Sequence, residues 1–174
     1  VEGRVGKQPD GTAKTREVKL VCVWTADSND KEGNPIRDKG SVSYNAAIES
    51  AAYVEKDESP SEFALRVERE ARRTGFENAH RQVIIGDGAK WIWALAYELF
   101  PHGIQIVDLY HALETVSTVA KKIFGVESEL GDQKAQSWRK FLERGAIDEI
   151  IGALTAFEEK HPEATTCINY LETN

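Results

Sequence analysis

Residues 81–111 read RQVIIGDGAKWIWALAYELFPHGIQIVDLYH, and this stretch decides the fold. The apolar, β-branched run at 83–85 predicts a buried strand that stops at Gly86-Asp87-Gly88, where two glycines permit a sharp turn. A helix is predicted next, because apolar residues recur at helical spacing as far as Leu99 and Pro101 closes the element. The continuous apolar run at 104–107 predicts a second strand, covered on both faces.

A strand, helix and strand this close together are typical of a right-handed crossover between parallel strands. Parallel sheets place functional groups at the carboxyl ends of their strands, and Asp87 and Asp108 both follow a predicted strand. Carboxylate pairs are preferred ligands of magnesium and manganese ions, so both aspartates are candidate metal ligands. His111 is a further candidate, and its alternative is a helix-start residue that caps the backbone or is solvated.

The amino-terminal part of the chain predicts a two-stranded antiparallel arrangement. Residues 1–16 are rich in glycine and polar residues without periodicity, so we expect a loop or a disordered arm. Apolar residues on both alternating sets of positions from about 16 to 24 predict a strand buried on both faces. The charged loop at 27–40 then joins this strand to a second arm at 41–48.

Helices are predicted in the rest of the chain. One begins at Ser59-Pro60-Ser61-Glu62, with Ser59 as N-cap and Pro60 in the first turn, and ends at Gly75. Another spans residues 113–123 and stops at Gly125, and apolar patterns near 138–142 and 147–157 predict two more. The fold class is therefore α/β, a mixed sheet with a helical appendage around one ordinary core.

Composition limits the function classes. The formal net charge of -7 argues against DNA binding by bulk positive charge, although much of the acidic excess lies in the last part of the chain. Basic residues gather near 4–19 and 66–81, where a solvated helix face and a flexible arm are favoured over a phosphate-binding surface. The far-separated Cys22 and Cys167 favour free thiols in a reducing compartment over a disulfide.

The chain has no visible targeting signal and one partial nucleotide-binding motif. No membrane-length apolar run and no signal peptide are visible, and the sequence contains no methionine, so we expect an excerpt of a longer protein. Gly86 and Gly88 follow a strand and open a helix, as in a dinucleotide-binding fingerprint, but Trp91 occupies the third glycine position and argues against it. No nucleophile elbow, Walker phosphate loop or zinc spacing is present.

Three segments resemble the ISKra group of bacterial insertion-sequence transposases and, more distantly, the Mutator-like DDE transposases. They read GKQPDGTAKTREVKL at 6–20, GDGAKWIW at 86–93 and IVDLYHA at 106–112. The resemblance implies an RNase H-like sheet in which three acidic residues hold two metal ions for DNA cleavage and strand transfer. Asp87 matches the second acidic residue, and Asp108 with His111 matches an aspartate-x-x-histidine signature close to the catalytic site.

The resemblance also implies how the chain is organised. Residues 1–124 would form a partial RNase H-like catalytic core that lacks its first strand, and residues 125–174 a helical insertion. The first catalytic aspartate is expected before Val1 and the final glutamate beyond Asn174, so this excerpt alone is expected to be inert. Asp10 lies in a polar loop ahead of the strand and is not taken as the first ligand.

Partners and location follow from the same resemblance. Asp87 and Asp108 would hold Mg²⁺ or Mn²⁺ in a two-metal site, with His111 beside it. Transposon ends and target DNA would be the partners, and candidate DNA contacts are Lys14, Arg16, Lys19 and Lys90. The full-length protein would act in the cytoplasm at the nucleoid, without a membrane, and homo-oligomers are compatible with this function.

Two rival functions remain open on the residues alone. One is an inactive remnant or interaction module on the same scaffold, binding protein or nucleic acid, with the acidic helical tail as a protein-binding surface. The other is a small-molecule nucleotide-binding α/β domain, which requires phosphate at the helix start beside Gly88.

Overall fold

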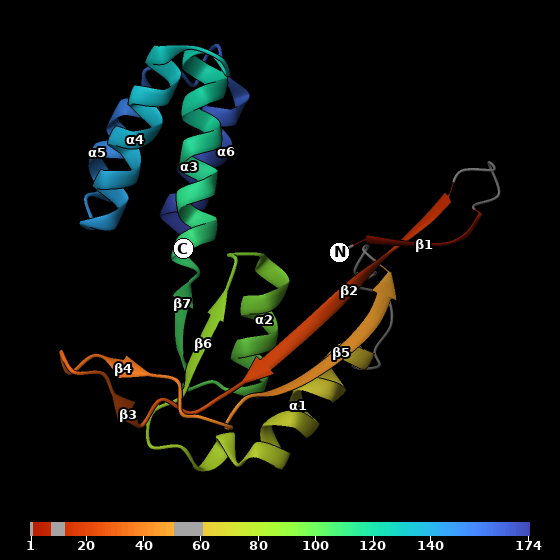
Figure 1. The fold of residues 1–174 in the computed structure, drawn as a ribbon. Coiled ribbons are helices and arrows are strands. Elements are labelled where there is room, and N and C mark those ends of the chain that lie inside the picture. Colours follow the sequence, from red (N-terminus) through yellow and green to blue (C-terminus); the bar gives the residue numbers. More distant parts are fainter. Residues whose placement is uncertain (1, 8–12, 51–60) are drawn as a thin grey trace. The chain divides into compact units, whose positions relative to one another are not determined.

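The computed structural model describes residues 2–7, 13–50 and 61–174. The chain forms two compact units, Val1–Gln82 and Val83–Asn174, and each is described by itself (Figure 1). The architecture is mixed α/β, as the sequence predicted, but the described strands pair in three sheets where one mixed sheet was predicted. Within the described ranges, no helix is both long and apolar enough to cross a membrane.

The first unit is built on an antiparallel sheet in the order β1-β2-β5. Its strands are β1 (Glu2–Lys7), β2 (Ala13–Val23) and β5 (Ser43–Ser50), and the predicted pairing of the β2 and β5 segments is confirmed. The expectation of a loop or disordered arm over residues 1–16 is wrong at residues 2–7 and 13–16, where β1 and the start of β2 pair, and residues 1 and 8–12 lie outside the described residues. An edge strand is held by backbone hydrogen bonds to its neighbour. These bonds do not require a regular pattern of apolar residues, so no sequence pattern revealed the strand.

One helix covers one face of this sheet. α1 (Glu62–Thr74) buries Phe63, Val67 and Ala71 and contacts β2 and β5. The helix begins at Glu62 with Ser61 as N-cap, since the Ser61 hydroxyl accepts a 3.0 Å hydrogen bond from the Ala64 amide. The predicted cap at Ser59 is therefore displaced to Ser61, and Ser59 itself lies outside the described residues.

The predicted burial of β2 on both faces is wrong. The side chains of Val18 and Leu20 are 37% and 61% exposed, whereas Lys19, which points to the opposite face, is 8% exposed. The register pairs Val18 with Ile48, which is also exposed. An apolar run predicts a strand, but it does not specify a second covering layer.

The remaining short elements of this unit connect its larger parts. β3 (Ser28–Asn29) pairs antiparallel with β4 (Pro35–Ile36) inside the predicted charged loop. α1 ends at Gly75, whose φ of 73° is the left-handed conformation that favours glycine, and the short 3₁₀ helix η1 (Phe76–Asn78) follows.

The second unit opens with the predicted strand, helix and strand. β6 (Val83–Gly86) is followed by α2 (Lys90–Leu99) and β7 (Ile104–Val107), and the two strands are parallel, as expected (Figure 1). Their predicted burial on both faces is wrong, because Ile85, Ile104 and Ile106 are each about half exposed. The described neighbours of this two-stranded sheet therefore leave part of its apolar surface open.

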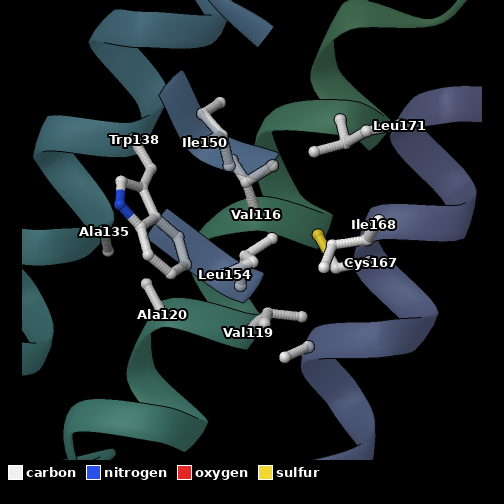
Figure 2. Close-up of a cluster of buried hydrophobic side chains, with 11 residues drawn as sticks. Val116, Val119, Ala120, Ala135, Trp138, Ile150, Leu154, Cys167, Ile168 and Leu171 are labelled. Carbon is white, nitrogen blue, oxygen red and sulfur yellow. The ribbon is translucent and has the colours of Figure 1, made fainter. Parts of the chain in front are cut away.

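Four helices complete this unit and enclose the largest core. They are α3 (Leu109–Phe124), α4 (Glu129–Glu143), α5 (Ile147–Thr155) and α6 (Pro162–Thr173). Figure 2 shows their apolar side chains converging, with Val116, Ile150, Leu154 and Cys167 at most 1% exposed. α3 to α5 match the predicted helices, whereas α6 was not assigned. The helices after Gly125 share a core with α3. The predicted division into a core at 1–124 and a helical insertion at 125–174 stays a prediction.

Candidate active site

The turn after β6 requires both of its glycines. A Cβ atom on Gly86 would lie 2.9 Å from Cγ2 of Ile92 and 3.1 Å from the Trp93 ring, so any side chain would displace α2. Gly88 has a φ of 94°, and a Cβ there would lie 2.7 Å from the ring of Tyr170. The strand therefore passes into α2 through a close-packed turn, with Asp87 between the glycines.

Asp87 and Asp108 follow paired positions of the parallel strands. Gly86 is opposite Val107 in the β6–β7 register, so the next residue on each strand is an aspartate. The Asp108 amide donates a 2.7 Å hydrogen bond to the Gly86 carbonyl oxygen, which extends the strand pairing to this point. The two aspartates therefore occupy neighbouring strand ends, as the sequence predicted.

Each carboxylate is oriented by a nearby backbone amide. Oδ1 of Asp87 accepts a 2.9 Å hydrogen bond from the amide of Ala89, just before α2. Oδ1 of Asp108 accepts a 2.8 Å hydrogen bond from the amide of Tyr110, so Asp108 is the N-cap of α3. These bonds use one oxygen of each carboxylate and hold both side chains at the beginnings of helices.

His111 lies in the first turn of α3, three residues after Asp108. Its side chain is exposed, and its ring centroid is 6.1 Å from that of Tyr170 in an edge-on arrangement at 67°. The cap of this helix is Asp108, so the alternative role of His111 as a capping residue is not needed. The exposed imidazole fits the alternative of a solvated side chain, and a role for His111 in the site stays a prediction.

Sequence reasoning missed the part of this site that comes from α6. The Tyr170 hydroxyl donates a 3.3 Å hydrogen bond to the backbone carbonyl oxygen of Asp87, 83 residues away in the chain. Near it, the Trp93 indole donates a 2.6 Å hydrogen bond to Oδ1 of Asn174. The helical spacing of Ala164, Cys167 and Leu171 could have identified α6, but no sequence signal connects it to residue 87.

The electrostatics agree with this proximity. Burial raises the pKa of the Tyr170 hydroxyl, and the negative charges of Asp87 and Asp108 raise it further. A phenol influenced by both carboxylates is therefore kept neutral and acts as a hydrogen-bond donor. Burial also raises the pKa of the Cys167 thiol to about 11. Cys167 and Cys22 are both free, as predicted, and Cys167 is part of the helical core.

The residues present fit part of a divalent-metal site. Two carboxylates at adjacent strand ends are the oxygen donors that Mg²⁺ and Mn²⁺ prefer. Over residues 2–7, 13–50 and 61–174, no three His, Cys, Asp or Glu side chains gather closely enough to hold a metal ion. Asp87 and Asp108 would therefore supply two ligands of such a site, and a further carboxylate would have to complete it.

The predicted DNA contacts have different positions. Lys90 is exposed at the first position of α2, beside the acidic turn Gly86-Asp87-Gly88. Lys19 is 8% exposed, which does not suit a phosphate contact, because alternation along β2 directs it to the covered face of the sheet. The side chains of Lys14 and Arg16 lie outside the described residues. A phosphate contact at Lys90 stays a prediction.

Three of the four arginines of α1 are engaged with neighbouring acidic residues. Arg66 pairs with Glu62 at 2.5 Å and Arg72 with Glu68 at 2.6 Å, both four residues apart on the helix. Arg73 pairs with the buried Glu70 at 2.5 Å. These pairs agree with the favoured interpretation of a solvated helix face, since three of the positive charges already have partners and Arg69 is exposed.

Comparisons with protein-family models, with curated proteins and with solved structures give no significant match.

Proposed function

We propose that this chain is the central part of a metal-dependent DDE transposase that cleaves DNA and transfers strands. The observation that supports this function best is the parallel pairing of β6 with β7, which brings Asp87 and Asp108 to neighbouring strand ends. His111 follows one helical turn later, in the spacing of the transposase signature that the sequence resembles. An RNase H-like arrangement of the complete sheet is part of the proposal.

The residues divide the work of such a reaction. Asp87 and Asp108 would hold the metal, because their carboxylates are exposed or half-buried oxygen donors on one sheet edge. Divalent ions bound there would supply activation of a water or DNA 3′-hydroxyl and neutralisation of charge on the phosphate. His111 would contact or support the reacting DNA, and the exposed Lys90 would neutralise a phosphate nearby.

The deciding experiment replaces Asp87 with Asn in the full-length protein and measures strand transfer with Mg²⁺. The amide oxygen of Asn can still accept the hydrogen bond from Ala89, so the turn is expected to stay folded. We expect strand transfer to fall by on the order of 100-fold or more, the scale for losing one preorganised charge-stabilising group. Asp148→Asn, the same change on exposed α5 surface, is the matched control. Unchanged strand transfer in Asp87→Asn would overturn the proposal.

A second candidate function is a binding module that performs no catalysis. One observation favours it: Val18, Leu20, Tyr44 and Ile48 form an exposed apolar face on β2 and β5. Large exposed apolar patches are typical of protein-binding surfaces. This function predicts a defined partner complex that Leu20→Asp disrupts. It also predicts that no divalent metal binds at Asp87.

A further inference from the structure

The last turn of α6 reaches the acidic turn of the candidate site. In Figure 1 the carboxyl end of the chain lies beside the start of α3, close to the end of β7. Two contacts join these segments, the Tyr170 hydroxyl on the Asp87 carbonyl oxygen and the Tyr170 ring beside His111. The helical segment, expected to be an insertion, therefore contributes directly to the surroundings of Asp87.

Tyr170 restrains the turn from more than one direction. Its hydroxyl donates to the Asp87 backbone, while its ring lies so close to Gly88 that a Cβ there would approach it to 2.7 Å. The same ring is paired edge to face with the imidazole of His111. One side chain therefore contacts the backbone that carries Asp87 and lies beside His111, three residues after Asp108.

The position of Tyr170 is itself fixed by the helical core. Its helix neighbours Cys167 and Leu171 are 1% and 7% exposed and belong to the main apolar cluster. A side chain anchored on a packed helix holds its hydrogen-bond partner more precisely than a side chain on a loop does. Tyr170 therefore connects the four-helix core to the turn at residues 86–88.

We propose that Tyr170 is a positioning residue that holds the Gly86-Asp87-Gly88 turn so that the Asp87 carboxylate faces the metal beside Asp108. This inference rests on the proposed function, because it assigns the purpose of the contact to the same metal site. Tyr170 touches the backbone of Asp87 and not the reacting atoms, so it acts through Asp87. Loss of the Tyr170 hydroxyl makes the turn less ordered. Metal binding is then weaker, because part of its free energy is used to order the turn.

The test uses Tyr170→Phe in the full-length protein, which removes the hydroxyl and keeps the ring. Binding of Mn²⁺ alone is measured from the electron paramagnetic resonance signal of the free ion. We expect the dissociation constant to rise on the order of fivefold, the scale of one lost hydrogen bond. Strand transfer is expected to return toward the wild-type rate at saturating Mn²⁺, because the metal then orders the turn.

Two control variants separate positioning from general loosening. Tyr97→Phe makes the same chemical change on an α2 tyrosine that is 72% exposed, and Ile168→Val removes one methylene from the core on α6 itself. Both are expected to keep the wild-type Mn²⁺ affinity. Hydrogen exchange of the Ala89 amide, which bonds Asp87, gives a second measurement, expected to accelerate only in Tyr170→Phe.

The outcomes distinguish the inference from the function on which it rests. If Asp87→Asn abolishes Mn²⁺ binding while Tyr170→Phe keeps wild-type affinity and Ala89 exchange, the metal site stands and the positioning role is overturned. An equal loss of affinity in Ile168→Val also overturns it, since general loosening then explains the effect. If the wild-type protein binds no Mn²⁺, or Asp87→Asn binds it normally, the proposed function is overturned and the positioning role with it.

Discussion

The amide nitrogen of Asp108 donates a 2.7 Å hydrogen bond to the carbonyl oxygen of Gly86. This bond lies just beyond the paired residues of β6 and β7 and fixes where both strands end. Because Asp87 directly follows Gly86, the same bond sets the register of the two aspartates. A backbone contact therefore brings the side chains of the candidate site together.

Asp108 combines a structural role with its proposed role as a metal ligand, and two substitutions separate them. Asp108→Asn keeps an oxygen that accepts from the Tyr110 amide, so the cap of α3 and the free energy of unfolding should change little. Asp108→Ala removes the cap and should lower the free energy of unfolding by about 1 kcal/mol. Chemical denaturation measures this difference.

The metal affinity of the two Asp108 variants should not follow the order of their stability. Both Asp108 variants lose the carboxylate, so both should bind Mn²⁺ more weakly than the wild type whatever their stability. An Asp108→Asn protein with normal Mn²⁺ affinity would show that this residue serves only as a helix cap.

Gly86 should tolerate no side chain. In Gly86→Ala the new Cβ would lie 2.9 Å from Ile92 and 3.1 Å from Trp93, so α2 must shift away from β6. We expect the free energy of unfolding to fall by about 1–3 kcal/mol, the usual scale of overpacking. Gly152→Ala is the control, because nothing lies within 4 Å of its Cβ and it sits inside α5. That variant should be neutral or more stable by about 0.5–1 kcal/mol. Equal thermal denaturation midpoints for the two variants would contradict this account.

The central unit could be predicted because its signals are local. Two short apolar runs, a glycine-bounded turn and helical spacing between them specify β6, α2 and β7, and the aspartates follow from counting residues. The same runs suggested burial on both faces, which is wrong, since β-branched side chains favour a strand whether or not a second layer covers it.

Features that depend on distant partners were missed. The β1 strand is defined by backbone pairing with β2, and its sequence has no alternation to reveal it. α6 has apolar residues at helical spacing, but the adjacent β-branched Thr165 and Thr166 weaken the pattern. The contact of Tyr170 with Asp87 spans 83 residues and depends on where α6 packs against α3 and α5.

The buried Glu70 should make the stability of the first unit depend on acid pH. Hydrogen bonds from Arg73 and Ser43 lower the pKa of this carboxyl from 4.5 to about 2, and the positive charge of Arg73 contributes as well. Because the folded-state pKa lies below the unfolded-state value, the stabilisation is fully present above about pH 4.5 and is lost as the pH falls toward 2.

Glu70→Gln tests this dependence. The amide keeps the shape of the side chain but has no charge to titrate, so the fall in stability between pH 4.5 and 2 should become shallower in the variant. Glu68→Gln is the matched control, since Glu68 pairs with the exposed Arg72 on the outer side of the same helix. Denaturation measured over this pH range gives both slopes. Parallel slopes of the free energy of unfolding against pH in the wild type and Glu70→Gln would mean that another carboxyl group causes the acid sensitivity. The network that joins α1 to β5 through Ser43 would then contribute no pH-dependent stability.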